Sequence, residues 1–211
     1  MRRYLYFLLA ILGYILFSSK SCSDRTENNA VSQEESLIQE KSEILNEFGS
    51  EFLPVKSLNA FEHKAKQKLI DLTDYLNILS DNSMDSSFKE QSKLMIFSLF
   101  ISDTTRIRNR LINDSDFRMV SVKEFVMATT RSGSKKIMLG SIRVTEPLHI
   151  TSGLRYKGRL AFSGWTQNRS AKDSVSSPPV TLQAEFFVSK IKKSFGTDTL
   201  QVWNLSLGTI Y

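Results

Sequence analysis

The sequence predicts an α+β protein in which N-terminal helices pack on a curved antiparallel sheet that ends in a long C-terminal hairpin. Apolar residues recur at steps of three and four over residues 59–79, as on one face of a helix. Apolar and polar side chains alternate over residues 154–167, as in a strand with one buried side. Residues 180–193 and 199–210 are rich in β-branched and aromatic residues on either side of a turn at Gly196, which is typical of a hairpin. Helices that precede a run of strands favour the α+β class.

Residues 1–21 have the features of a secretory signal peptide. Arg2 and Arg3 precede an uncharged apolar run of 14 residues at positions 4–17, whereas a membrane-spanning helix needs about 20. Small serines follow, and then Cys22, the only cysteine in the chain. A single cysteine excludes an intramolecular disulfide, so the domain depends on its core for stability.

This arrangement resembles the lipobox of bacterial lipoproteins, in which the cysteine is acylated, with palmitate among the acyl chains, after the signal is cut before it. Ser19 and Lys20 stand where the lipobox usually has an aliphatic and a small residue. The alternatives are an ordinary cleaved signal and an uncleaved anchor, with Cys22 as a bystander. The resemblance implies a lipid anchor on the periplasmic side of the cell envelope. Asp24 is an inner-membrane retention signal only in some enterobacteria, so the outer membrane is slightly favoured over the inner one.

The composition suits one globular domain. Removal of residues 1–21 leaves 190 residues with 25 basic and 22 acidic side chains, a net charge of +3. This balance is too weak to indicate a nucleic-acid partner, which an exported protein rarely meets.

The chain after Cys22 is expected to begin with a tether, followed by the helical part of the domain. Residues 22–36 are polar and without apolar periodicity, as in a flexible spacer, and residues 37–113 form the helical part. A weak helical pattern covers 37–48. The helix over 59–79 is expected to start with a capping box of Asn59 and Glu62.

Two further helices are predicted before the sheet. Ser87 and Glu90 have capping-box spacing ahead of a helix over 88–101, which is apolar nearly all round from Leu94 and is therefore expected to be buried on most sides. Residues 104–113 predict a short basic helix. Its arginines are interpreted as a solvated face, or alternatively as a contact for lipid headgroups or an acidic partner.

Residues 114–211 are expected to form the sheet part of the same domain. Residues 120–129 fit either a helical turn or a strand. A strand is predicted over 137–144, with Glu146-Pro147 separating it from a short strand over 148–150. In the alternating strand over 154–167, Gly158 and Gly164 indicate a bend or the close approach of a helix.

The order of elements over residues 59–211 resembles the nuclear transport factor 2-like (cystatin-like) superfold. The resemblance implies a bent sheet around a long helix that leaves a cone-shaped pocket. Some members are isomerases or dehydratases, and many only bind or dimerise through the sheet, so the fold does not determine the function.

Candidate catalytic chemistry is sparse, and no catalytic residue, metal site or cofactor is predicted. The two histidines are far apart and there is one cysteine, which excludes the usual metal-ligand clusters. His63 lies among charged residues and is expected to be solvated. His149 could act as a general base in a pocket, but no acidic partner can be chosen for it. Trp203 either lines a pocket or fills the core, and the core is the favoured reading.

The function predicted from the sequence is a non-catalytic binding or structural module, such as an accessory subunit of a membrane or secretion assembly. Arg155, Lys157 and Arg159 share one face of their strand and either meet an acidic envelope protein partner or form an ordinary solvated face. The alternative is a small-molecule-binding protein or enzyme that uses a cone-shaped pocket with His149 or Trp203 inside. A lipocalin-type lipid carrier is a third reading, against which the early helices argue.

Overall fold

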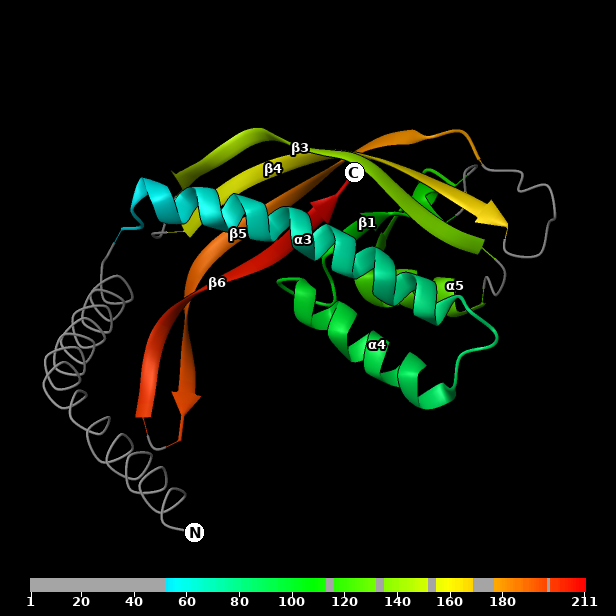
Figure 1. Cartoon of the computed structure of the whole chain (residues 1–211), viewed down its shortest axis with the longest axis horizontal. Coiled ribbons are helices and arrows are strands. Elements are labelled where there is room, and N and C mark those ends of the chain that lie inside the picture. Colours follow the sequence, from blue (N-terminus) through cyan, green and yellow to red (C-terminus); the bar gives the residue numbers. More distant parts are fainter. Residues whose placement is uncertain (1–51, 113–115, 132–134, 152–154, 169–176, 197) are drawn as a thin grey trace, which may run out of the picture. The chain divides into compact units, whose positions relative to one another are not determined.

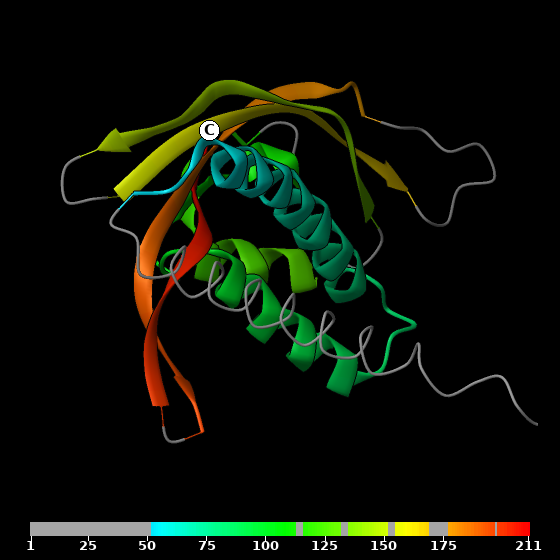
Figure 2. The same cartoon turned by 60° about the vertical axis from the view of Figure 1, so that its left-hand side comes forward.

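The structure is a computed structural model that describes residues 52–211 except 113–115, 132–134, 152–154, 169–176 and 197. The predicted signal peptide, Cys22, the tether and the helix over 37–48 lie outside the described residues. The described chain is an α+β domain with three α-helices and a six-stranded mixed sheet that ends in a strand hairpin (Figure 1). In both views the three helices lie on the same face of the sheet (Figures 1 and 2).

The long helix α3 (Val55–Leu79) buries the stripe that the sequence predicts. Its buried apolar residues are Ala65, Leu69, Leu72, Leu76 and Leu79. The predicted start at Asn59 is wrong, because the helix begins four residues earlier, after Pro54 at the N-cap position. Glu62 therefore does not close a capping box, and its Oε1 instead accepts a hydrogen bond of 2.9 Å from the backbone N–H of Leu148.

The second helix, α4 (Ser86–Leu99), is capped by a different residue from the one predicted. The carboxylate of Asp85 accepts a 2.8 Å hydrogen bond from the backbone N–H of Ser87, while Glu90 pairs with Lys93 at 2.6 Å. The expectation that this helix is buried on most sides is also wrong, because Leu94 is 64% exposed. The helix packs against the rest of the domain through one stripe only, so some of its apolar side chains stay exposed.

The ambiguous segment over 120–129 combines strand and helix. Strand β2 (Met119–Ser121) leads directly into helix α5 (Val122–Arg131). Ser121 and Glu124 form a reciprocal capping box, in which the Ser121 N–H donates to Glu124 Oε2 at 2.9 Å and the Glu124 N–H donates to Ser121 Oγ at 3.2 Å.

The predicted short basic helix over 104–113 is wrong. This segment forms strand β1 (Arg106–Arg108) and the 3₁₀ helix η1 (Asn109–Leu111). Ile107 is completely buried between two arginines that are not, which is the alternation of a strand.

Four long strands form an antiparallel series in chain order. They are β3 (Lys135–Thr151), β4 (Arg155–Asn168), β5 (Val180–Phe195) and β6 (Asp198–Ile210). Strand β1 pairs antiparallel with β2 but parallel with β6, so the sheet is mixed rather than purely antiparallel, with the order β2-β1-β6-β5-β4-β3. The predicted break at Glu146-Pro147 is absent, because β3 continues through Pro147 and absorbs it in register shifts at the outer edge of the sheet.

The core lies between the helices and the inner face of the sheet. Most of the apolar residues expected on the inner faces of the two alternating strands are buried, namely Tyr156, Leu160, Phe162, Leu182, Ala184, Phe186 and Val188. Val180 is only partly buried, and Leu154 lies outside the described residues. A Cβ on Gly158 would lie 2.5 Å from the Phe186 ring, and one on Gly164 would lie 2.8 Å from Leu111 of η1. Close approach, by a ring in one case and a short helix in the other, therefore explains both glycines.

Candidate binding groove

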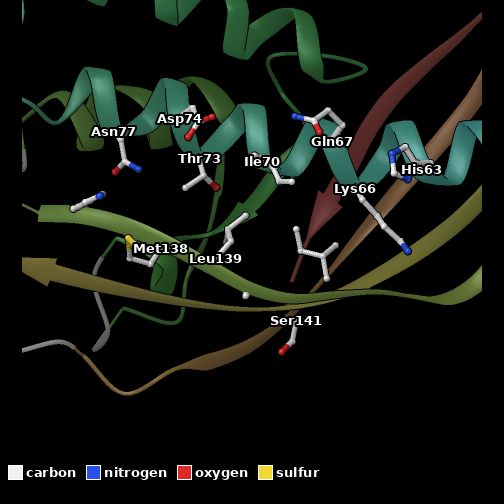
Figure 3. A pocket seen from close by; sticks show the side chains of 13 residues that line it. His63, Lys66, Gln67, Ile70, Thr73, Asp74, Asn77, Met138, Leu139 and Ser141 are labelled. Carbon is white, nitrogen blue, oxygen red and sulfur yellow. The ribbon is translucent and has the colours of Figure 1, made fainter.

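A groove of about 650 Å³ opens between α3 and the edge strand β3 (Figure 3). On the helix side its wall includes His63, Lys66, Ile70 and Asp74, and on the strand side it includes residues 138–142. We call it the α3–β3 groove. Apolar side chains from both elements meet polar and charged ones in it, which is the mixture that ligand sites typically show.

Hydrogen bonds from α3 hold β3 at both ends of this groove. At one end the side-chain amide of Asn77 hydrogen-bonds to both backbone groups of Ile137. Its Oδ1 accepts from the Ile137 N–H at 2.7 Å, and its Nδ2 donates to the Ile137 carbonyl at 2.9 Å. Ser80 Oγ adds a 2.9 Å bond to the carbonyl of Lys135. At the other end Glu62 accepts from the N–H of Leu148. These bonds occupy outward-facing backbone groups that an edge strand otherwise leaves open.

The stretch of β3 between these two attachments is irregular. The pairing with β4 shifts register between Gly140 and Arg143, and Ser141 has a positive φ of 51°. A bulge of this kind bends an edge strand and interrupts its ladder. Ser163 Oγ donates to the Gly140 carbonyl at 2.9 Å and fixes the bulge from the β4 side. The irregular stretch forms one wall of the α3–β3 groove, and hydrogen bonds from Asn77 of α3 and Ser163 of β4 hold the strand from both of its sides.

The groove side chains do not converge as a catalytic set does. His63 and Lys66 come from one part of α3, and Asp74 comes from further along the same helix. Within the described ranges no group of three or more His, Cys, Asp or Glu side chains could hold a metal ion. The arrangement can hold a ligand through apolar contacts and separate polar contacts at its rim.

His149 lies away from this groove, on the sheet face opposite to the helices. It pairs in register with Lys157, and directly opposed residues share a face. Its side chain is 47% exposed, with Nε2 3.5 Å from Glu146 Oε1, and Arg159 approaches the other oxygen of Glu146 at 3.4 Å. The acidic neighbour is therefore Glu146, and the register shifts in β3 place His149 on the outer face of the sheet and not between the sheet and the helices.

Trp203 lies on the inner face of the sheet. It is 8% exposed and makes an edge contact with the ring of Tyr156 at 5.7 Å between centroids. Lys190 covers the indole from the strand beside it at 5.2 Å. His149 and Trp203 thus lie on opposite faces and do not share a site.

Arg155, Lys157 and Arg159 do share the outer face, together with two aromatic rings that the sequence did not single out. Arg155 and Lys157 lie over Phe187 at 5.8 and 5.6 Å, and Arg159 lies over Tyr211 at 5.7 Å. A carboxylate also accompanies two of the three cations, since Lys157 contacts Glu185 at 2.6 Å and Arg159 contacts Glu146. The face is therefore less basic than its β4 residues suggest, and an acidic partner for it stays a prediction.

Comparisons with known proteins place the chain in no family. No protein-family model matches it, and no curated protein matches it either. Among solved structures it is similar to the crystal structure of the Kfla4162 protein from Kribbella flavida, with 12% identity over 71% of this chain and 94% of that one, at a TM-score of 0.30. A likeness at that score carries no argument about fold or function.

Sequence reasoning missed the groove residues, although a signal for them exists. Beside the core stripe of α3 runs a second row at positions 63, 67, 70, 74 and 77, again at steps of four and three. Its mixture of His, Gln, Ile, Asp and Asn is not apolar, so it does not register as a buried face. Only the position of β3 makes this row one wall of the groove.

No helix in the described part of the chain is long and apolar enough to cross a membrane.

Proposed function

We propose that this protein is a lipid-anchored component of the cell envelope whose α+β domain is a non-catalytic binding module. The single observation that supports the binding role is the α3–β3 groove, which is framed by hydrogen bonds at both ends and has a mixed apolar and polar lining.

The anchor is Cys22, acylated after signal cleavage on the periplasmic side, with the outer membrane slightly favoured. The finer fold is a curved sheet of the nuclear transport factor 2-like kind around α3, and the bulges in β3 support that curvature.

The ligand we favour is an extended segment of another envelope protein. An open groove along an edge strand exposes apolar side chains beside backbone groups, and an extended chain can satisfy both. A small-molecule ligand is the second candidate, because a volume of about 650 Å³ lies within the range of small-ligand sites, roughly 300–1,000 Å³. For this alternative the ligand lies in the α3–β3 groove and not in a cone-shaped pocket with His149 or Trp203 inside.

Site-specific photocrosslinking in intact cells tests the groove. A photoreactive amino acid at Gln67, which is exposed in the groove wall, is compared with the same residue at Gln91, which is exposed on α4. We expect a discrete adduct at position 67 that is absent at position 91, and mass spectrometry of the adduct separates a protein segment from a small molecule.

Ile70→Glu places a charge on the 40% exposed apolar side chain of the same wall and is expected to reduce the adduct at position 67 at least tenfold. Equal adducts at both positions, or adducts that Ile70→Glu leaves unchanged, would contradict the groove as the binding site.

A further inference from the structure

The last two strands continue beyond the sheet as a two-stranded arm. Pairing of β4 with β5 ends at Tyr156 and Val188, whereas pairing of β5 with β6 continues to Phe195 and Asp198. We call the part beyond Val188, residues 189–204 without the undescribed 197, the β5–β6 arm. Figures 1 and 2 show it projecting away from the helices and the other strands. At about 3.3 Å per residue, the seven arm residues of β5 span roughly 20 Å.

The β5–β6 arm is basic on one strand and apolar on one face. Three of four successive β5 positions are lysines, at Lys190, Lys192 and Lys193, and Asp198 is the one acidic residue over 189–204. Ile191 and Leu200 are 40% and 42% exposed. The register places Ile191 opposite Val202 and Lys193 opposite Leu200, so the two exposed apolar side chains are diagonal neighbours on one face. Lys193 shares that face, whereas Lys190 and Lys192 lie on the other face with Trp203.

Protection of an open strand edge explains only part of this composition. Lysines on edge strands discourage the addition of further strands, and both outer edges of the arm lack a neighbouring strand in the described chain. That role does not require two exposed apolar residues as neighbours on one face of the arm. Lysines beside exposed aliphatic side chains are instead typical of segments that lie at a membrane interface, where the long stems contact apolar groups and the amines reach the headgroups.

We infer that the β5–β6 arm docks on an anionic phospholipid surface through the face that Ile191, Leu200 and Lys193 share. Lys190 and Lys192, on the other face of the same two-stranded ribbon, add positive charge within about one screening length of the headgroups. Charge complementarity identifies the partner. Residues 52–211 contain 23 basic and 14 acidic side chains, a net charge of +9, whereas residues 23–51 contain 2 and 8, a net charge of −6. The positive charge therefore belongs to the domain, and the arm presents it on a projecting element. The inference rests on the proposed function only in that a lipid anchor brings the arm to a membrane.

The test uses the mature chain, residues 22–211, with Cys22→Ala, so that binding does not depend on an acyl anchor. Sedimentation with vesicles of equimolar phosphatidylcholine and phosphatidylglycerol is compared with sedimentation with phosphatidylcholine alone. We expect binding to the anionic vesicles only. The variant Lys190→Gln/Lys192→Gln/Lys193→Gln should bind them about 100-fold more weakly, as expected for three lysines near an anionic surface. A matched control, Lys56→Gln/Lys64→Gln/Lys123→Gln, removes the same charge from exposed helical positions and should bind almost as the parent does.

A fluorescence measurement locates the contact independently of the lysines. Cys22 is the only cysteine, so Cys22→Ala allows single labelling with an environment-sensitive dye at Ser194→Cys in the arm or at Gln91→Cys on α4, both exposed positions. Anionic vesicles should shift the emission of the dye in the arm and not that of the dye on α4. No binding to anionic vesicles, equal loss in the two lysine variants, or equal shifts at the two labels would overturn the inference. None of these outcomes alters whether the wild-type chain is anchored through Cys22 or crosslinks through its groove.

Discussion

Asp116 is a partly buried carboxylate that is held by several hydrogen bonds from its neighbours. It accepts hydrogen bonds from the Asn109 amide at 2.7 Å, from the Arg118 backbone N–H at 3.0 Å and from the Arg118 guanidinium at 2.7 Å. These bonds, with the Arg118 side chain as the largest influence, hold the pKa of Asp116 well below its usual range. The same pair raises the pKa of Arg118. The interaction links η1 to the start of the segment that leads into β2.

Asp116→Asn is expected to lower stability at neutral pH and to have a smaller effect in acid. A carboxyl group whose pKa is depressed in the folded state contributes stability above its unfolded pKa, about 3.9, and loses that contribution as the pH falls below this value. The urea unfolding midpoints of wild type and variant should therefore differ at pH 7 and converge towards pH 2. Asp103→Asn, at an exposed position, serves as the control. A constant difference between wild type and Asp116→Asn across this range would exclude the ionised carboxylate as the cause.

At the scale of elements, the attachment of α3 to β3 determines whether a groove exists. Asn77 satisfies both backbone groups of a strand residue that is 60 positions away in the chain, and Glu62 reaches one that is 86 positions away. Each bond uses an edge-strand group that would otherwise face solvent or a second chain. The unattached stretch between them contains the bulge at Ser141 and faces the groove.

Asn77→Ala is expected to destabilise the protein by about 1–3 kcal/mol, because it removes both bonds to Ile137 and leaves these backbone groups without their amide partner. Urea unfolding measures the loss, and amide exchange at Ile137 should become faster. Asn59→Ala is the matched control, since the structure places Asn59 inside α3 and not at its cap. We expect that control to change stability by less than about 0.5 kcal/mol. Similar losses in the two variants would contradict the attachment.

At the scale of the whole molecule, charge is divided between the N-terminal segment and the domain. The net charge is −6 over residues 23–51 and +9 over residues 52–211. The net charge of +3 over residues 22–211 conceals this division. A lipid anchor at Cys22 would hold the basic domain at a membrane, where the β5–β6 arm can meet anionic headgroups.

Cys22→Ala is expected to move the protein from the membrane to the soluble fraction, because in the proposed function acyl chains on Cys22 would provide the anchoring free energy. Detergent-phase partitioning and labelled palmitate incorporation measure this change. The lysine variant of the arm, with Cys22 intact, should still partition with the detergent. Equal membrane attachment of the Cys22→Ala chain would show that the apolar run over residues 4–17 is itself the anchor.

The sequence alone was sufficient for the elements whose pattern is local. Periods of 3.6 and 2 residues are visible within one segment of sequence, without knowledge of what that segment packs against. They predict the apolar stripe of α3, the alternation in β4 and the C-terminal hairpin. Local signals gave wrong helix starts where the same capping pattern occurs at more than one position. The capping-box spacings at Asn59 and Ser87 do not form the predicted caps, whereas the same spacing at Ser121 and Glu124 does form a capping box.

The groove, the faces of His149 and Trp203, and the parallel pairing of β1 with β6 were decided by the tertiary structure. Each depends on residues far apart in the chain, such as the 103 positions between Leu53 and Tyr156, whose backbone N–H and hydroxyl meet at 2.9 Å. Three register shifts in β3 also change which face a residue occupies, and a one-residue shift reverses the result of simple alternation. Composition therefore identified which residues could be buried, and long-range packing selected which surfaces stay open to bind.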